Sequence, residues 1–121
     1  MNDQQYPWCI LVPKKAGLQE IHQLTTEEQQ QFIQESSQVA KCLESLFQAD
    51  KMNIAALGNM VPQLHIHYVV RYKHDKSWPK PVWGQFAAEP YDKVLLQKRV
   101  AQLAAAGLPT DIFYQNHPEG C

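Results

Sequence analysis

The chain has 121 residues, 45% hydrophobic and 19% charged, so it can bury a core and we expect one domain. Its 11 basic and 12 acidic residues give a net charge of −1, which argues against a broad basic surface for duplex nucleic acid. It shows no signal peptide, no apolar run near the ~20 residues of a membrane span and only 3 scattered cysteines, so we expect a cytoplasmic protein without disulfides.

The N-terminal half begins with a short strand and a long helix. Residues 8–12 are apolar and lie between two prolines, which predicts a buried strand. Thr25 and Glu28 have the spacing of a capping box, and apolar residues recur at helical spacing after them. The sequence therefore predicts an amphipathic helix of about six turns that ends near Ala49.

The second half continues with a hairpin, a loop and another helix. Residues 52–57 and 63–72 have β-favouring patterns and a short connection, which predicts an antiparallel hairpin. Residues 73–90 are proline-rich and predict a loop, 91–106 a second helix, and 107–121 an irregular tail. We therefore expect an α+β fold, with an antiparallel sheet packed on the long helix and a second helix near the C-terminus.

The strand predicted over residues 63–72 carries two of the five histidines on one face. Side chains alternate along a strand, so the odd-numbered residues, among them His65 and His67, share a face, and the even-numbered residues, all apolar or aromatic, cover the core. The polar histidine face has no such role. Three interpretations remain open for it: no special role, a Zn²⁺ site that would need further ligands, or nucleophilic catalysis on phosphorus.

The run from Asn53 to His67, NIAALGNMVPQLHIH, resembles the signature of the histidine-triad (HIT) family. That family carries three alternating histidines on a strand, with an upstream amide and a glycine-containing phosphate loop. The order of elements over residues 7–72 is also similar. Residues 78–84, WPKPVWG, resemble a proteobacterial branch of HIT-domain proteins in which Gln replaces the first histidine.

The resemblance implies a nucleotide hydrolase or transferase that acts at an α-phosphate, on dinucleoside polyphosphates or nucleoside phosphoramidates, without a cofactor or metal. By this likeness His65 is the nucleophile that becomes nucleotidylated, and His67 is the proton donor and phosphate contact. Gln63 stands at the first triad position. It keeps the backbone carbonyl with which family members orient the ring of the nucleophile.

Further positions match the family's binding residues. Asn53 corresponds to the upstream amide, and Gly58 and Asn59 correspond to the phosphate loop. We expect Trp83 either to close the pocket over a base or to pack within its own loop. Arg71 shares the histidine face, where we favour a structural ion pair over a phosphate contact.

The resemblance also implies a homodimer that binds a nucleotide. Family members usually carry a β-hairpin before the strand predicted at residue 8, whereas seven residues precede it here, so we expect one HIT-like domain over 1–121 that lacks this hairpin. Two alternatives are a nucleotide-binding module without turnover, and a zinc protein that uses His65 and His67.

Overall fold

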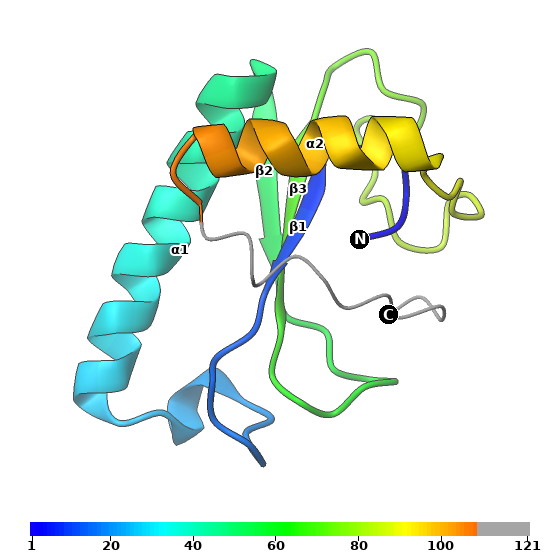
Figure 1. The fold of residues 1–121 in the computed structure, drawn as a ribbon. Coiled ribbons are helices and arrows are strands. Elements are labelled where there is room, and N and C mark those ends of the chain that lie inside the picture. The colour runs from blue at the N-terminus through cyan, green and yellow to red at the C-terminus, as the bar shows by residue number, and fades with distance from the viewer. Residues whose placement is uncertain (109–121) are drawn as a thin grey trace.

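The computed structural model describes residues 1–108. Its elements are β1 (Trp8–Leu11), the short 3-10 helix η1 (Ile21–Gln23), α1 (Thr26–Phe47), β2 (Lys51–Ala55), β3 (Ile66–Arg71) and α2 (Lys93–Ala105) (Figure 1). This is the predicted α+β fold, with an antiparallel sheet and two helices. Most of the tail predicted over 107–121, including His117 and Cys121, lies outside the described residues.

The histidine strand β3 is the central strand of the sheet, in the order β1-β3-β2, and both pairings are antiparallel. The predicted hairpin of β2 and β3 is therefore confirmed. Val69 lies opposite Trp8 on one side and Asn53 on the other, and His67 lies opposite Ala55. Because directly opposed residues share a face, Trp8 and Asn53 lie on the histidine face.

The strands are shorter than the sequence predicted. β1 ends at Leu11, β2 ends at Ala55 and β3 begins at Ile66, so residues 63–65 precede the strand. Gly58, in the connection, has a φ of 74°, a left-handed conformation that suits glycine. The sequence overpredicted the strands because alternation of polar and apolar residues indicates which way side chains face. It does not indicate where the hydrogen bonds between strands end.

Helix α1 begins with the predicted capping box. Thr25 Oγ1 accepts a hydrogen bond from the Glu28 amide at 3.2 Å, and the Glu28 carboxylate accepts one from the Thr25 amide at 2.8 Å. Lys15 also reaches Glu28, at 3.0 Å. The backbone hydrogen bond and then the one from Lys15 lower the pKa of the Glu28 carboxyl. The helix ends at Phe47, and Gln48 follows with a φ of 52°.

One face of the sheet packs on both helices, with α2 crossing the sheet near one end of the strands (Figure 1). The buried residues of this core are Cys9, Leu18, Leu24, Leu43, Leu64, Ile66, Tyr68, Val70 and Leu103. Within it, the Tyr68 hydroxyl donates to Ser36 Oγ at 2.8 Å. Burial raises the pKa of the Cys9 thiol to about 11, so this cysteine stays protonated at neutral pH.

The opposite face is covered by the N-terminal segment and by the loop that follows β3. The N-terminus lies beside this loop (Figure 1), and Gln4 donates its amide to the Glu89 carbonyl at 2.7 Å. The alternating pattern marked this face as polar and without a role in the core, yet both histidines on it are buried: His65 is 6% and His67 0% exposed. The face is buried because the tryptophan-containing loop folds back over it.

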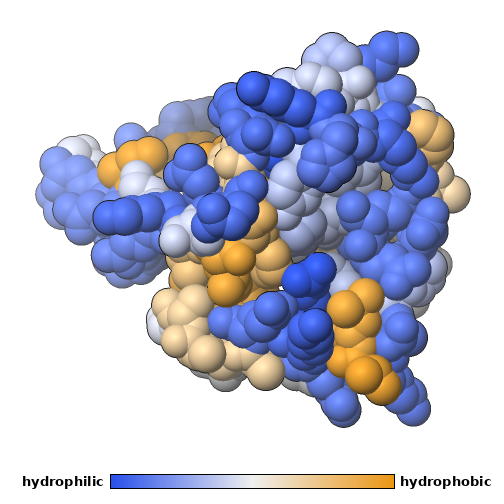
Figure 2. All heavy atoms as spheres, turned by 90° about the horizontal axis from the view of Figure 1, so that it is seen from above, coloured by the Kyte–Doolittle hydropathy of each residue, from blue (hydrophilic) through white to orange (hydrophobic). Residues whose placement is uncertain are grey.

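The surface carries no single dominant apolar region in the view from above, where hydrophobic atoms gather in separate patches among hydrophilic ones (Figure 2). The most exposed large apolar side chains of the described residues are Met60 and Val94. Among the helices of residues 1–108, none has both the length and the apolarity needed to cross a membrane.

Candidate active site

His65 lies immediately before β3, with its ring held by the backbone. Its Nδ1 is 2.7 Å from the carbonyl oxygen of Gln63. A carbonyl oxygen can only accept, so Nδ1 carries the hydrogen and the neutral ring keeps its lone pair on Nε2. That Nε2 is buried and has no hydrogen-bond partner among the described residues. The ring is therefore oriented with an unused, unprotonated nitrogen.

His67 is held in the opposite way. The indole N–H of Trp8 donates to its Nδ1 at 3.0 Å, so Nδ1 holds the lone pair and the neutral ring carries its hydrogen on Nε2. This Nε2 is also buried without a partner in the described part of the chain. The rings of His65 and His67 lie edge to face, with centroids 5.0 Å apart. The pair thus offers one acceptor nitrogen and one donor nitrogen.

The environment of His67 keeps its ring neutral. Burial, and to a smaller extent repulsion from His65, lowers the pKa of His67 from 6.5 to about 4. A donor already bound to Nδ1 also opposes protonation of that atom. At pH 7 the ring is therefore neutral and acts through its Nε2–H.

Two tryptophans enclose His67. Trp83 lies edge to face against it with ring centroids 5.5 Å apart, and Trp8 contacts Trp83 at the same distance. Trp83 Nε1 is buried and has no partner within residues 1–108. These contacts form an aromatic cluster that keeps water away from the histidine. Trp83 packs on β1 and β3 and not only within its own loop, and whether it closes over a base stays a prediction.

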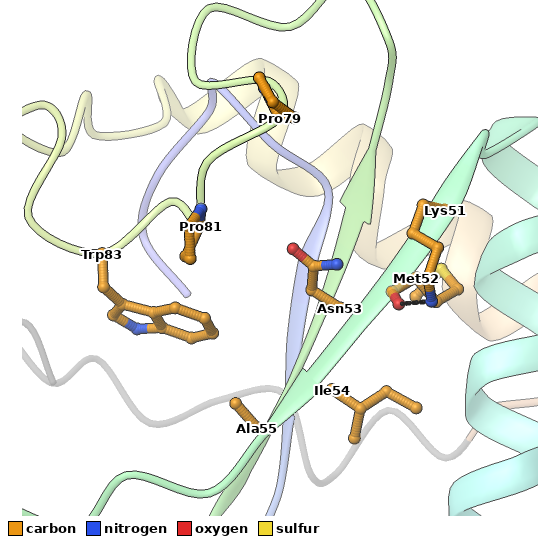
Figure 3. Close-up of a pocket in the computed structure, with 8 residues that line it drawn as sticks. All are labelled: Lys51, Met52, Asn53, Ile54, Ala55, Pro79, Pro81 and Trp83. Atoms are coloured by element: carbon orange, nitrogen blue, oxygen red, sulfur yellow. Dashed lines mark hydrogen bonds between the residues drawn. The ribbon is translucent and has the colours of Figure 1, made fainter.

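A pocket of about 430 Å³ lies next to this cluster, between β2 and the loop (Figure 3). It is lined by Lys51, Met52, Asn53, Ile54, Ala55, Pro79, Pro81 and Trp83. The histidines do not line it, but Ala55 is the sheet partner of His67, so the pocket and the histidine pair adjoin. Its volume falls within the roughly 300–1,000 Å³ of small-molecule sites.

Asn53 lines this pocket (Figure 3), and a buried arginine orients its side chain. Arg71 donates to Asn53 Oδ1 at 2.7 Å, which leaves the amide N–H groups for other partners. Arg71, 1% exposed, also donates to both carboxylate oxygens of Asp75, at 2.8 and 3.1 Å, and to the Lys80 carbonyl. The ion pair predicted for Arg71 is confirmed.

The carboxylate of Asp75 is ionised in this network. Burial alone would raise the pKa of Asp75, but hydrogen bonds from Arg71 and from the Tyr72 amide outweigh it and lower the pKa. The network ties the end of β3 to the start of the loop. It therefore fixes both Asn53 and the loop segment that carries Trp83.

Two predicted phosphate-binding residues make no hydrogen bond to the histidine pair within residues 1–108. Gly58 and Asn59 lie in the connection between β2 and β3, and Asn59 is exposed, with no hydrogen-bond partner for its side chain in the described residues. Gln63 contributes its carbonyl to His65, whereas its side-chain amide donates to the Lys15 carbonyl at 3.1 Å. The structure thus brings Gln63, His65 and His67 together.

A sequence model of the HIT domain matches residues 1–74. The chain belongs to the histidine-triad (HIT) family. The family resemblance carried by residues 53–67 is thereby confirmed. That the glutamine at position 63 marks a branch of the family stays a prediction.

Solved HIT proteins share this fold. The crystal structure of a histidine triad protein from Marinobacter aquaeolei VT8 is 48% identical, with a TM-score of 0.85, over 88% of this chain and 77% of that one. HIT proteins from Sinorhizobium meliloti 1021 and Bradyrhizobium japonicum are each 40% identical, with TM-scores of 0.84, over 88% of this chain and 78% and 79% of theirs. A comparison with curated proteins gave no match.

The sequence did not reveal Trp8 as part of the HIT site. Trp8 and His67 are 59 positions apart, and only the register of β1 against β3 places the indole beside the imidazole. Alternation along residues 8–12 shows that Trp8 and Ile10 share a face. It does not show which face of the sheet that is.

The zinc alternative finds no complete ligand set within residues 1–108. Within the described residues, no group of three or more His, Cys, Asp or Glu side chains is placed to hold a metal ion. His65 and His67 would supply two ligands, whereas protein zinc sites use at least three.

Proposed function

We propose that this HIT protein hydrolyses or transfers a nucleotide at its α-phosphate, through a nucleotidyl intermediate on His65. The observation that carries the proposal is the hydrogen bond from His65 Nδ1 to the Gln63 carbonyl, with Nε2 buried and without a partner among residues 1–108. A neutral imidazole nitrogen with a directed lone pair is a competent nucleophile toward phosphorus. Dinucleoside polyphosphates and nucleoside phosphoramidates are the candidate substrate classes.

The reaction proceeds in two displacements. First, Nε2 of His65 forms a bond to the α-phosphorus, and the bond to the leaving group breaks with its electron pair on the leaving atom. The ring becomes cationic, and the Gln63 carbonyl, which accepts its Nδ1–H, stabilises that charge. Then a water oxygen bonds to phosphorus, the N–P electron pair returns to Nε2, and the attacking water gives one proton to the solvent. A hydroxyl in place of water gives transfer.

The remaining residues bind and orient the substrate in this proposal. His67 donates its Nε2–H to a phosphate oxygen or to the leaving group. Asn53 offers its amide N–H groups to ribose or phosphate oxygens, and Gly58 and Asn59 contact phosphate. Trp83 forms an aromatic wall of the pocket, on which a base can pack.

Gln63 acts through its backbone in this proposal. Its side-chain amide donates to the Lys15 carbonyl instead of to the His65 ring. Replacement of the first triad histidine by glutamine therefore preserves the group that orients the nucleophile.

Turnover in isotopically labelled water tests the proposed chemistry. Attack at the α-phosphate predicts that the label enters the nucleoside monophosphate, and that His65→Ala loses turnover while it still binds nucleotide. If the wild-type protein binds nucleotide but turns over neither a diadenosine polyphosphate nor adenosine phosphoramidate, the protein is a binding module. Label in the leaving group alone would contradict attack at the α-phosphate.

The assembly is proposed to be a homodimer. In the described sheet, β2 is an outer strand, and Ile54, Leu57 and Met60, in and after it, are exposed. An unpaired strand edge can pair with a second copy. Light scattering on the purified protein should give twice the mass of 13.9 kDa, and a monomer at micromolar concentration would contradict the assignment.

A further inference from the structure

The two histidines are different tautomers: His65 carries its hydrogen on Nδ1 and His67 on Nε2. A different hydrogen-bond partner fixes each tautomer. His65 donates from Nδ1 to a carbonyl, whereas His67 accepts at Nδ1 from the Trp8 indole. An indole N–H can only donate, so a protonated Nδ1 on His67 would face another donor. The Trp8 indole therefore selects the Nε2–H tautomer of His67, whereas the Gln63 carbonyl selects the Nδ1–H tautomer of His65.

The indole itself is firmly placed. Trp8 lies in β1 opposite Val69, and its ring rests edge to face on Trp83 with centroids 5.5 Å apart. Among the hydrogen bonds of residues 1–108, none joins a carboxylate to the ring of His65 or His67. A second proton on His67 would have to occupy Nδ1, which faces the Trp8 N–H donor. Within residues 1–108 no carboxylate is hydrogen-bonded to the ring to balance the added charge.

We propose that Trp8 is a positioning residue that fixes His67 as a neutral Nε2–H donor, and that it thereby selects substrates whose leaving group departs as an anion. The proposal rests on the function proposed above. It distinguishes nucleotide anhydrides, such as dinucleoside polyphosphates, from phosphoramidates.

The preference follows from where the proton must go. When an anhydride is attacked, the P–O electron pair stays on a phosphate oxygen, which leaves as an anion and needs only a hydrogen bond. When a phosphoramidate is attacked, the P–N pair stays on nitrogen, which needs a proton to leave as an amine. A neutral imidazole N–H gives up its proton poorly, whereas an imidazolium gives it up readily. The Trp8 bond thus suits the first substrate and not the second.

The tautomer can be measured without any substrate. Two-bond proton–nitrogen correlation spectra of the labelled protein at pH 7 distinguish protonated from unprotonated imidazole nitrogens. We expect His67 to be protonated at Nε2 alone in the wild type, and a mixture of tautomers in Trp8→Phe, which keeps an aromatic ring and removes the N–H. His67 protonated at Nδ1 in the wild type, or unchanged in Trp8→Phe, would overturn the proposal.

Trp83→Phe is the matched control for this measurement. Trp83 also contacts the His67 ring at 5.5 Å between centroids, but it makes no hydrogen bond to it. We therefore expect His67 to keep its Nε2–H tautomer in Trp83→Phe, as in the wild type. If Trp83→Phe changes the tautomer as much as Trp8→Phe, packing and not the indole hydrogen bond controls His67, and the proposal fails.

Substrate preference is the second readout. Trp8→Phe should lower kcat/KM for a diadenosine polyphosphate about five- to tenfold, the worth of one neutral hydrogen bond. It should lower kcat/KM for adenosine phosphoramidate less, so the ratio of the two falls. An unchanged ratio overturns the selection of leaving groups. If neither substrate turns over while the tautomer behaves as expected, the proposed function fails and the positioning role of Trp8 stands.

Discussion

On the helix-covered face of β3, the buried Tyr68 hydroxyl has a partner in Ser36, whereas on the opposite face the Nε2 atoms of His65 and His67 have none in the described chain. Leaving a buried polar atom without a partner costs about 1–3 kcal/mol. The Tyr68 hydroxyl on the helix-covered face therefore does not incur this cost. The histidine face holds polar atoms ready for a ligand, and functional sites are where such local cost is expected.

The histidine face is not simply poorly packed. At the other end of β3 from the histidines, Arg71 is 1% exposed. It has hydrogen bonds to Asn53, Asp75 and the Lys80 carbonyl. Five buried side-chain polar atoms of residues 1–108 have no hydrogen-bond partner: Gln5 Oε1, His65 Nε2, His67 Nε2, Trp83 Nε1 and Arg99 Nε. The two histidines and Trp83 contribute three of the five and lie together in the aromatic cluster, which is where a ligand is expected to bind.

The largest expected effect is on catalysis by His65. His65→Ala should lower kcat/KM by more than about 10⁴-fold, since it removes the nucleophile. Its free energy of unfolding should change little, because the ring has a single hydrogen bond and one unpartnered nitrogen. Steady-state kinetics and urea denaturation measure the two. Activity within tenfold of wild type would remove His65 from its proposed role.

Arg71 tests whether the satisfied part of the histidine face is a structural anchor. Arg71→Met should lower the free energy of unfolding by about 3–5 kcal/mol, because it leaves the Asp75 carboxylate buried and unpaired. Lys76→Met is the control, since Lys76 pairs with Glu89 at the exposed surface and should cost less than about 1 kcal/mol. Equal costs in the two variants would contradict the anchor.

The low pKa of His67 predicts a pH dependence of stability. The unfolded chain binds a proton near pH 6.5, whereas the folded chain binds it only near pH 4. The stability is therefore complete above pH 6.5 and falls as the pH drops toward 4. The difference between the two pKa values corresponds to a loss of roughly 3 kcal/mol in the free energy of unfolding. Urea denaturation at several pH values should show this loss in the wild type and not in His67→Gln. Parallel curves for both proteins would contradict the shift.

The smallest effect should come from the helix face. Tyr68→Phe removes the hydrogen bond to Ser36 and should cost about 1 kcal/mol of stability without loss of activity. Adding Ser36→Ala removes the partner that was left alone and should recover part of that cost. A loss of activity in Tyr68→Phe under conditions where the protein stays folded would contradict the separate roles of the two faces.

The sequence predicted the parts of the fold that depend on local patterns. The capping box at Thr25 and the helical spacing after it predicted α1 to within two residues. Alternation along the strand predicted over residues 63–72 placed His65 and His67 on one face, and the site motif lies in one continuous run. These features need only neighbouring residues, so a single sequence contains them.

The rest depends on contacts between distant segments. The partnership of Trp8 with His67 requires the register of two strands, and the burial of the histidine face requires the loop after β3 to fold back with Trp83. Arg71 was predicted to make an ion pair, but its hold on Asn53 follows only from the pairing of β2 with β3. No local pattern encodes these placements.

The most direct test of the central claim is to trap the intermediate. The wild-type protein is mixed with a radiolabelled diadenosine polyphosphate, denatured within the first turnover in alkali, where a phosphorus–nitrogen bond survives, and digested for mass spectrometry. The structure leads us to expect a nucleotidyl group on the peptide that contains His65, and none in His65→Ala. Turnover of the substrate with no label on His65, or with label on His67 instead, would contradict the account.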